Sequence, residues 1–221
     1  MLVHPYDSAM SEDEWRSWIA HSAKFGVLAV GAGAGQAPIM VPTHFVLSGD
    51  EIVIHLHKVN DAIPHLETGA NVSLSIVGDY AFIPGAWRAK DPANLRDGVP
   101  TSYYAAVNFV CQPTVVSDAV EVAQIIQAHM GEFQPAGDYA VVDSVTAPYG
   151  PMMTIIRGIR LKIVGVDAKF KYDDHKSVEF REAMIERLNA RNIHQDAGAA
   201  AQQARRLGLI GEWSEFRHNH S

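Results

Sequence analysis

The sequence predicts a mainly β protein with α-helices, built on an antiparallel barrel of about six strands with helices at its periphery. Several runs of apolar and β-branched residues are bounded by glycine or proline turns, as strands are. These runs follow one another along the chain and do not alternate regularly with helices, which argues against a doubly wound parallel sheet. Amphipathic helical segments lie between and after the runs, so we expect the helices to surround the barrel.

The first element is a helix that we expect to begin at Ser11, with Glu14 three residues later completing a capping box. Trp15, Trp18 and Ile19 recur at helical spacing and indicate one apolar face. Two tryptophans on one face could stack on a ligand. Core packing is the preferred interpretation, because this spacing is that of a buried helix face.

The strands follow this helix, and turn residues separate them. The GAGAGQ run at residues 31–36 is expected to be a hairpin turn, because its third glycine has the wrong spacing for a phosphate-binding loop and no helix follows. A short helix is expected to begin at Asn60 or Asp61 and to end at Gly69. The expected strands cover residues 24–30, 38–47, 51–57, 72–78, 80–84, 101–116 and 152–166.

A long polar segment, residues 85–100, precedes the strand at 101–116 and is expected to be an irregular loop. Loops of this length are uncommon in compact domains and are often functional. The later helices are expected to run from a cap at Asp118 to Gly131, from Ser177 to Asn192, and from Ala197 to Leu207.

Composition bounds the class of protein. The 221 residues suffice for one large domain or one domain with an appendage. No run reaches the roughly 18 apolar residues of a membrane helix, and no signal peptide is recognisable, so we expect a cytoplasmic protein without membrane contact. The net charge of −7 lowers the expectation of direct DNA contact, because DNA-binding surfaces are basic.

Cysteine and histidine provide little evidence of a reactive or metal site. Cys111 is the single cysteine and lies in an apolar strand, so buried packing is expected. His55 and His57 lie two apart in a strand and share one face. A zinc site needs three or four ligands and no third is suggested, so we expect no metal. The HNHS tail at residues 218–221 is interpreted as a disordered end.

Four segments join strands to polar groups: residues 41–45, residues 55–61, the loop with Trp87 and Arg88, and residues 99–109. Flavin mononucleotide (FMN) needs such a set. Its phosphate takes Lys, Arg or hydroxyl donors, and its ring system takes backbone amides and an apolar face. On the residues alone, a solvated barrel rim is the simpler interpretation.

Three stretches change this assessment. GDYAFIPGAW (78–87), VPTSYYAAVNF (99–109) and RGIRLKIVGVDAKFK (157–171) resemble, in order and spacing, the PaiB family of the FMN-binding split-barrel superfamily, described as negative transcriptional regulators. HLHKVND (55–61) also matches the family's pattern. The resemblance implies a six-stranded split β-barrel at residues 1–170, a helical extension at 171–221, and a homodimer with the flavin between the subunits.

The resemblance also implies a set of flavin-binding residues. The strand containing VPTHF (41–45) and the strand running into HLHK (55–58) would line the flavin. Lys58 would bind its phosphate, and two residues of the later strand would face the site. The chain departs from the family's pattern within that later strand, where Asn108 replaces a histidine. The implied residues are Val41, Pro42, Thr43, His44, Lys58, Asn60, Tyr104 and Asn108.

Three functions stay open at this point, and so does the question of whether the protein is an enzyme, because a fold does not decide function. The first is a PaiB-like FMN-binding regulator that acts on DNA directly or through a partner. The second is a flavin-dependent oxidoreductase acting on a small substrate. The third is a haem-binding or haem-degrading protein with His44, His55 or His57 as the axial ligand.

Overall fold

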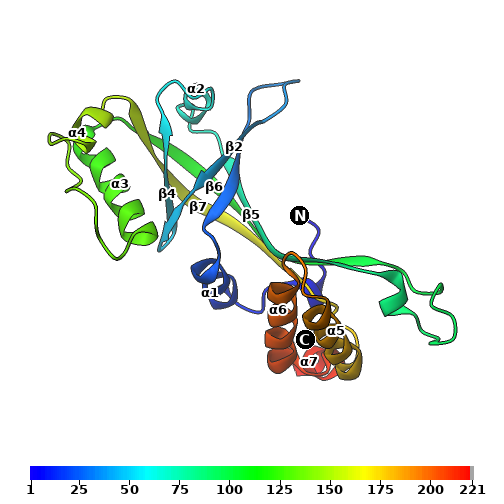
Figure 1. Ribbon diagram of the computed structural model, residues 1–221. Coiled ribbons are helices and arrows are strands. Elements are labelled where there is room, and N and C mark those ends of the chain that lie inside the picture. Colours follow the sequence, from blue (N-terminus) through cyan, green and yellow to red (C-terminus); the bar gives the residue numbers. More distant parts are fainter. Residues whose placement is uncertain (220–221) are drawn as a thin grey trace. The chain divides into compact units, whose positions relative to one another are not determined.

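The computed structural model describes residues 1–219 (Figure 1). Its described residues form one antiparallel sheet of seven strands in the order β2-β1-β5-β6-β7-β4-β3. The sheet confirms the expected mainly β class. The strands are β1 (Phe25–Val30), β2 (Ile39–His44), β3 (Val46–Ser48), β4 (Glu51–His57), β5 (Val72–Ile83), β6 (Thr101–Val116) and β7 (Ile156–Lys171).

Helices flank and follow these strands. His218 of the HNHS tail lies in the last helix, whereas residues 220 and 221 are outside the described residues. No helix within residues 1–219 has both the length and the apolar character needed to cross a bilayer. The helices are η1 (Pro5–Asp7), α1 (Glu12–His21), α2 (Ile63–Leu66), η2 (Gly85–Arg88), α3 (Ala119–Phe133), α4 (Tyr149–Met152), α5 (Val178–Arg191), α6 (Asp196–Ile210) and α7 (Trp213–Asn219).

The chain divides into two compact units. The sheet unit comprises Ser22–Ile76 and Asn108–Val166. The helical unit comprises Met1–His21, Val77–Val107 and the described residues from Asp167 onward. Strands β5, β6 and β7 contribute residues to both units. The domain boundary at residue 170 stays a prediction.

Phe45 alone separates β2 from β3, although these two strands are the opposite edges of the sheet. One residue spans at most about 3.5 Å, so the two edges must approach each other within the sheet unit. The sheet therefore curls into an open barrel, and within the described residues no ladder joins β2 to β3 to close it. The expectation of about six strands is wrong, because the sheet has seven. The buried Phe45 divides the strand expected at residues 38–47 into β2 and β3.

Strand β5 contains a bulge at Asp79, where φ is 51°. Before this residue the even positions of the strand are buried, and after it the odd positions Ala81 and Ile83 are buried. A bulge inserts one residue and exchanges the faces of a strand. The two strands expected at residues 72–78 and 80–84 are therefore one continuous strand.

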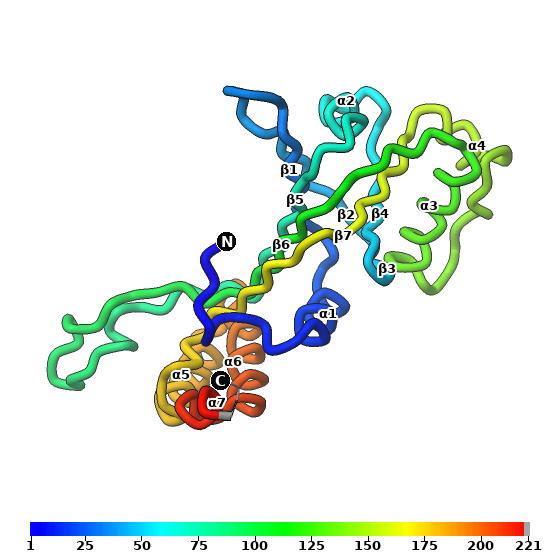
Figure 2. Tube along the Cα trace, turned by 180° about the vertical axis from the view of Figure 1, so that it is seen from behind, coloured from blue at the N-terminus to red at the C-terminus, as the bar shows by residue number. Residues whose placement is uncertain are grey.

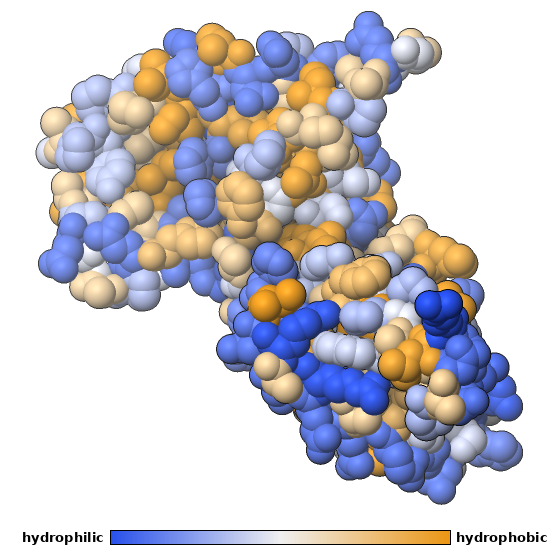
Figure 3. All heavy atoms as spheres, turned by 45° about the vertical axis from the view of Figure 1, so that its right-hand side comes forward, coloured by the Kyte–Doolittle hydropathy of each residue, from blue (hydrophilic) through white to orange (hydrophobic). Residues whose placement is uncertain are grey.

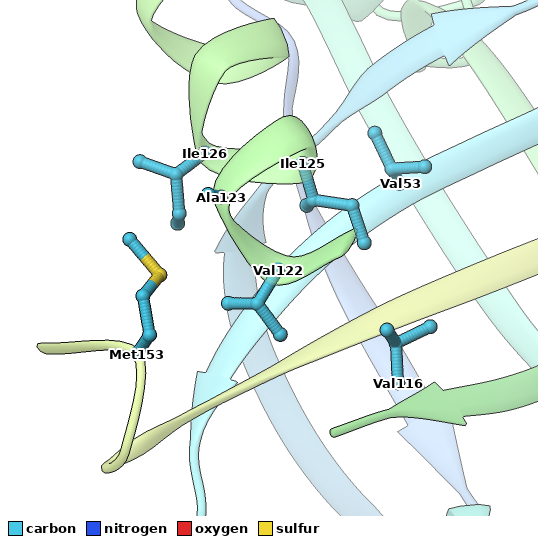
Figure 4. Packing of buried hydrophobic residues seen from close by; sticks show 7 residues of the cluster. All are labelled: Val53, Val116, Val122, Ala123, Ile125, Ile126 and Met153. Carbon is cyan, nitrogen blue, oxygen red and sulfur yellow. The ribbon is translucent and has the colours of Figure 1, made fainter. Parts of the chain in front are cut away.

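Helix α3 covers one face of the sheet unit (Figure 4). Val122, Ile125 and Ile126 of this helix pack with Val53 and Val116 of strands β4 and β6. The cap expected at Asp118 is confirmed, because its Oδ1 accepts hydrogen bonds from the backbone amides of Val120 and Glu121, at 3.0 Å each. The expected end at Gly131 is wrong: the helix continues to Phe133, since packing along its length outweighs the low helix propensity of one glycine.

In the helical unit the expected caps of α1 and α5 are confirmed. Ser11 Oγ accepts a hydrogen bond from the Glu14 amide at 3.3 Å, and Ser177 caps α5 through the Phe180 amide at 3.3 Å. The Glu14 carboxylate bonds to the Met10 amide at 2.7 Å and not to that of Ser11, so the capping box is displaced by one residue.

The long loop between β5 and β6 is held at its base within the helical unit (Figure 2). Arg88 forms an ion pair with Asp173, and the Trp87 carbonyl accepts a hydrogen bond from Arg187 Nη1 at 2.6 Å. The Arg191 guanidinium lies 4.7 Å from the centre of the Trp87 ring. The loop begins with the short helix η2 and is irregular only beyond it, and α5 fixes its start.

Candidate functional site

Strand β2 presents alternating residues of the expected flavin-binding set. Val41 and Thr43 are buried, whereas Pro42 and His44 are exposed. Within the described residues β2 pairs only with β1, so one side of its backbone is unpaired. Proline is tolerated on such an edge because it has no N–H to donate. The unpaired edge offers the backbone amides and carbonyls that the polar side of a flavin ring would need.

Thr43 has a more restricted role than the sequence suggested. Its Oγ1 donates to the His44 carbonyl oxygen at 2.9 Å, and the side chain is buried. The hydroxyl can still accept a hydrogen bond, but its proton is already used. Thr43 is therefore better suited to line a site than to donate a hydrogen bond to a phosphate.

His44 belongs to a group of five rings in the sheet unit, which we call the ring cluster. Its ring lies 5.1 Å, centre to centre, from both Phe25 and Phe133. Phe133 in turn stacks on His129 at 6.2 Å, and His129 meets His55 edge to face at 4.9 Å. Helix α3 thus links the end of β2 to the middle of β4.

The two inner histidines of the cluster are held neutral. Burial, followed by the neighbouring His129 and His44, lowers the pKa of His55 to about 4. Burial also lowers the pKa of His129. Its Nδ1 bonds to the Ile125 carbonyl oxygen at 2.9 Å and must therefore carry the proton, while the buried Nε2 has no partner with hydrogen-bond geometry among the described residues.

Lys58 and Asn60 lie in the turn after β4. The Lys58 amide donates to the Ile155 carbonyl at 2.8 Å, and its ammonium donates to the Thr154 carbonyl at 3.1 Å. Across residues 1–219 no carboxylate forms an ion pair with Lys58. Asn60 Oδ1 accepts from the Ala62 amide at 2.9 Å, which leaves the side-chain NH₂ as a free donor.

The other two expected residues lie on β6, in different units. Asn108 is half-buried in the sheet unit. Tyr104 lies in the helical unit, where the ammonium groups of Lys169 and Lys171 are 5.8 Å and 5.9 Å from its ring centre. The structure therefore gathers seven of the eight expected residues in the sheet unit and gives Tyr104 a basic environment of its own.

Sequence reasoning missed the contributions of His129, Phe133 and Phe25 to the ring cluster. The signal was present in α3, where His129 and Phe133 follow the buried Ile125 at intervals of four. It could not show which strand the helix covers. The expected absence of a metal site at His55 and His57 stays a prediction. Within residues 1–219 no three His, Cys, Asp or Glu side chains are grouped to hold a metal ion.

These residues fit the chemical demands of FMN. Lys58 has an ammonium without a carboxylate partner for a phosphate, Asn60 has a free NH₂, and the unpaired edge of β2 can face the polar side of the ring system. Bound FMN would supply electron-transfer chemistry. The residues named here would bind and orient it.

Comparison with known families agrees with this chemistry. Residues 1–164 match the family described as "Putative FMN-binding domain", so the chain belongs to that family. All eight expected site residues lie within the matched range. The family supports FMN as the suspected cofactor and supports binding of a flavin small molecule. No curated protein matches the chain.

Solved structures share the fold. The flavocytochrome Anf3 from Azotobacter vinelandii is 15% identical, with a TM-score of 0.59 over 76% of this chain and 72% of that one. The FAD and haem binding protein from Mycobacterium smegmatis is 16% identical, with a TM-score of 0.57 over 74% and 73%. The conserved hypothetical protein Rv2991 from Mycobacterium tuberculosis is 18% identical, with a TM-score of 0.54 over 77% and 90%. At these identities the likeness shows the fold alone.

Proposed function

We propose that this protein is an FMN-binding split-barrel protein of the PaiB type, working in the cytoplasm as a homodimer and as a negative regulator of transcription. The observation that carries FMN binding is the match of residues 1–164 to an FMN-binding family. In this proposal Lys58 and Asn60 hold the phosphate, and β2 lines the ring system with Val41, Pro42, Thr43 and His44. Tyr104 and Asn108 complete the site across the subunit interface.

A homodimer is supported by exposed apolar residues on β5. Val77, Tyr80 and Phe82 are 63%, 45% and 50% exposed, and all three lie in the helical unit. Figure 3 shows apolar residues interspersed with hydrophilic ones on one face of the molecule. Exposed apolar groups on a strand favour association. Light scattering behind a sizing column tests this: a mass near twice 24.2 kDa is expected, and a monomer at all concentrations would contradict it.

In this proposal the protein regulates transcription through a protein partner and does not contact DNA itself. The net charge of −7 disfavours a phosphate-binding surface, which DNA contact requires. We therefore expect no retardation of DNA by the purified protein at low salt. Salt-sensitive retardation would instead establish direct contact and overturn the indirect route.

Haem binding is a second candidate, because two structures with the same fold are described as a flavocytochrome and an FAD and haem binding protein. His44 is the candidate axial ligand, since its imidazole is exposed whereas His55 is half-buried within the ring cluster. The visible spectrum of the protein after incubation with FMN or haemin separates the candidates. Flavin bands retained after gel filtration support FMN, and a Soret band shifted by the protein and lost in His44→Ala would favour haem.

A further inference from the structure

A groove runs beside helix α3 in the sheet unit, and it contains none of the residues of the expected flavin site. One wall is formed by α3, with Val120, Ala123, Gln124 and Gln127. The opposite wall is formed by residues 142–144, in the loop that leads from α3 to α4 (Figure 1). The groove encloses about 320 Å³, at the lower end of the range for ligand sites.

Hydrogen bonds of the loop fix the shape of this groove. Gln127 Nε2 donates to Tyr139 Oη at 3.1 Å, which ties the loop to α3. Asp143 Oδ1 accepts from the amides of Val145 and Thr146 at 2.7 Å and 2.5 Å. The bond from Thr146, followed by that from Val145, lowers the pKa of Asp143, so this carboxyl is ionised. A preformed groove loses little conformational entropy when a partner binds.

Exposed apolar side chains extend the groove on both sides. Val120 on α3 is 56% exposed, and Val141 and Val145 of the loop are 75% and 84% exposed. Gln124 and Gln127 are exposed and uncharged, and they follow Val120 at helical spacing. A ridge of this kind on one helix suits the packing of a second helix against it.

The segment that forms the groove, residues 117–156, is acidic. It contains no lysine or arginine, because the basic residues of the sheet unit all lie elsewhere in the sequence. Those basic residues are Lys24, Lys58, Arg157, Arg160 and Lys162. The carboxylates of the segment belong to Asp118, Glu121, Glu132, Asp138 and Asp143. The groove therefore lies in a part of the chain with charges of one sign.

The negative charge of this segment is only partly compensated. Glu121 lies 3.9 Å from Arg160, which also pairs with Glu51, and Glu132 forms an ion pair with Lys24. Within residues 1–219, the carboxylates of the segment without an ion pair are those of Asp118, Asp138 and Asp143. An apolar groove with unpaired carboxylates around it is complementary to a partner that is apolar on one side and cationic beside it.

From this geometry we propose that the groove beside α3 docks a basic amphipathic helix of a protein partner. Its apolar residues would lie in the groove and its lysines or arginines would face the acidic segment, as in other helix-in-groove complexes. A second copy of this chain is less complementary, because its net charge is −7. The inference rests on the proposed regulation through a protein partner and does not depend on FMN binding.

Fluorescence anisotropy with two labelled helical peptides tests the charge preference. Both peptides have leucine at the same positions, and the remaining positions are lysine in one and glutamate in the other. Titrated with the full chain, the lysine peptide should bind with a Kd of about 10 μM or below, and the glutamate peptide about tenfold or more weakly. Equal binding of the two peptides, or no binding of the lysine peptide at roughly 100 μM chain, would overturn the proposal.

Variants of exposed residues test the place of binding. Gln124→Lys adds a positive charge to the groove and Val120→Gln removes an apolar contact, so each should weaken the lysine peptide about tenfold. Gln112→Lys and Val164→Gln make the same changes at exposed positions of the sheet unit outside the groove, and both should bind as the wild type does. Equal losses in the groove variants and the controls would show non-specific attraction to an acidic chain and overturn the proposal.

Two further measurements keep this inference apart from the proposed function. If light scattering shows that Val120→Gln converts a dimer to a monomer, the groove belongs to a second copy of the chain and the proposal is overturned. FMN affinity should be the same in wild type and in Gln124→Lys. Because the peptide titration uses neither FMN nor DNA, its failure would leave FMN binding and the absence of DNA contact to be tested separately.

Discussion

The ring of His55 meets the ring of His129 edge to face, with centroids 4.9 Å apart and an angle of 86° between the planes. One ring comes from β4 and the other from α3, so this contact joins the helix to the sheet. Both rings are held neutral by burial. The fold is therefore built for the uncharged form of this pair.

Acid should destabilise the sheet unit through this pair. The pKa of His55 is about 4 in the folded protein against an ordinary 6.5, so its contribution is complete above pH 6.5 and is lost as the pH falls towards 4. His129 and His44 are the titratable neighbours of this ring. We expect the free energy of unfolding to fall by roughly 2 kcal/mol as the pH falls over that range. Urea unfolding of wild type and His55→Gln measures it, and the variant should show the flatter pH dependence.

The control for this prediction is His57→Gln, because His57 is exposed on the same strand. It should keep the wild-type pH dependence. Equal pH dependence in wild type and His55→Gln would contradict the buried-pair account.

The buried carboxylate of Asp174 should be essential for stability. It pairs with Arg181 and Arg206, both of which are buried. Asp174→Asn would leave the buried Arg181 guanidinium without its carboxylate partner and would leave Arg206 with Glu14 alone, at a cost of about 3–5 kcal/mol. The exposed pair of Glu12 and Arg16 supplies the control: Glu12→Gln should change the free energy of unfolding by less than about 1 kcal/mol. Similar costs for the two variants would show that these buried pairs are not tightly coupled.

Lys58 should distinguish FMN from riboflavin, which lacks the phosphate. A charge-assisted hydrogen bond contributes about 1.5–3 kcal/mol, so Lys58→Ala should weaken FMN binding by roughly tenfold or more. Riboflavin affinity should stay unchanged. Lys162→Ala, which removes an exposed lysine of β7 in the same unit, should bind both flavins as the wild type does. If Lys58→Ala weakened the binding of FMN and riboflavin equally, Lys58 would not be the residue that binds the phosphate.

Gly98 closes the base of the long loop. A Cβ atom at this position would clash with the Gly85 carbonyl and lie 2.6 Å from the Ala89 amide nitrogen. Gly98→Ala should therefore open residues 85–100 and speed their cleavage in limited proteolysis. Gly208→Ala is the control, because a Cβ there meets nothing within 4 Å and alanine favours the helix. Cleavage at the wild-type rate would show that the loop tolerates a wider base.

Local features of this fold could be predicted from the sequence. Asp118 and Ser177 cap their helices as their spacing indicates. In β6 Tyr103 and Phe109 are buried while Tyr104 and Asn108 are half-buried, as the two-residue alternation of a strand predicts. Each of these features depends on residues a few positions apart.

Long-range features could not be predicted, because they depend on residues far apart in the sequence. Arg206 meets Glu14 across 192 positions, and His129 meets His55 from a different element. The bulge at Asp79 depends on the left-handed backbone conformation of this residue. The sequence around it predicts two separate strands. For the site, the resemblance implied Lys58 and Asn60 as flavin-binding residues, but sequence could not show that Tyr104 would lie beside two lysines.

Equilibrium titration of the purified wild-type protein with FMN, followed by quenching of flavin fluorescence, tests the central claim most directly. Membership of the FMN-binding family and the donors around β2 and Lys58 predict saturable binding with one FMN for each chain. Absence of saturable binding even at high micromolar FMN would contradict it.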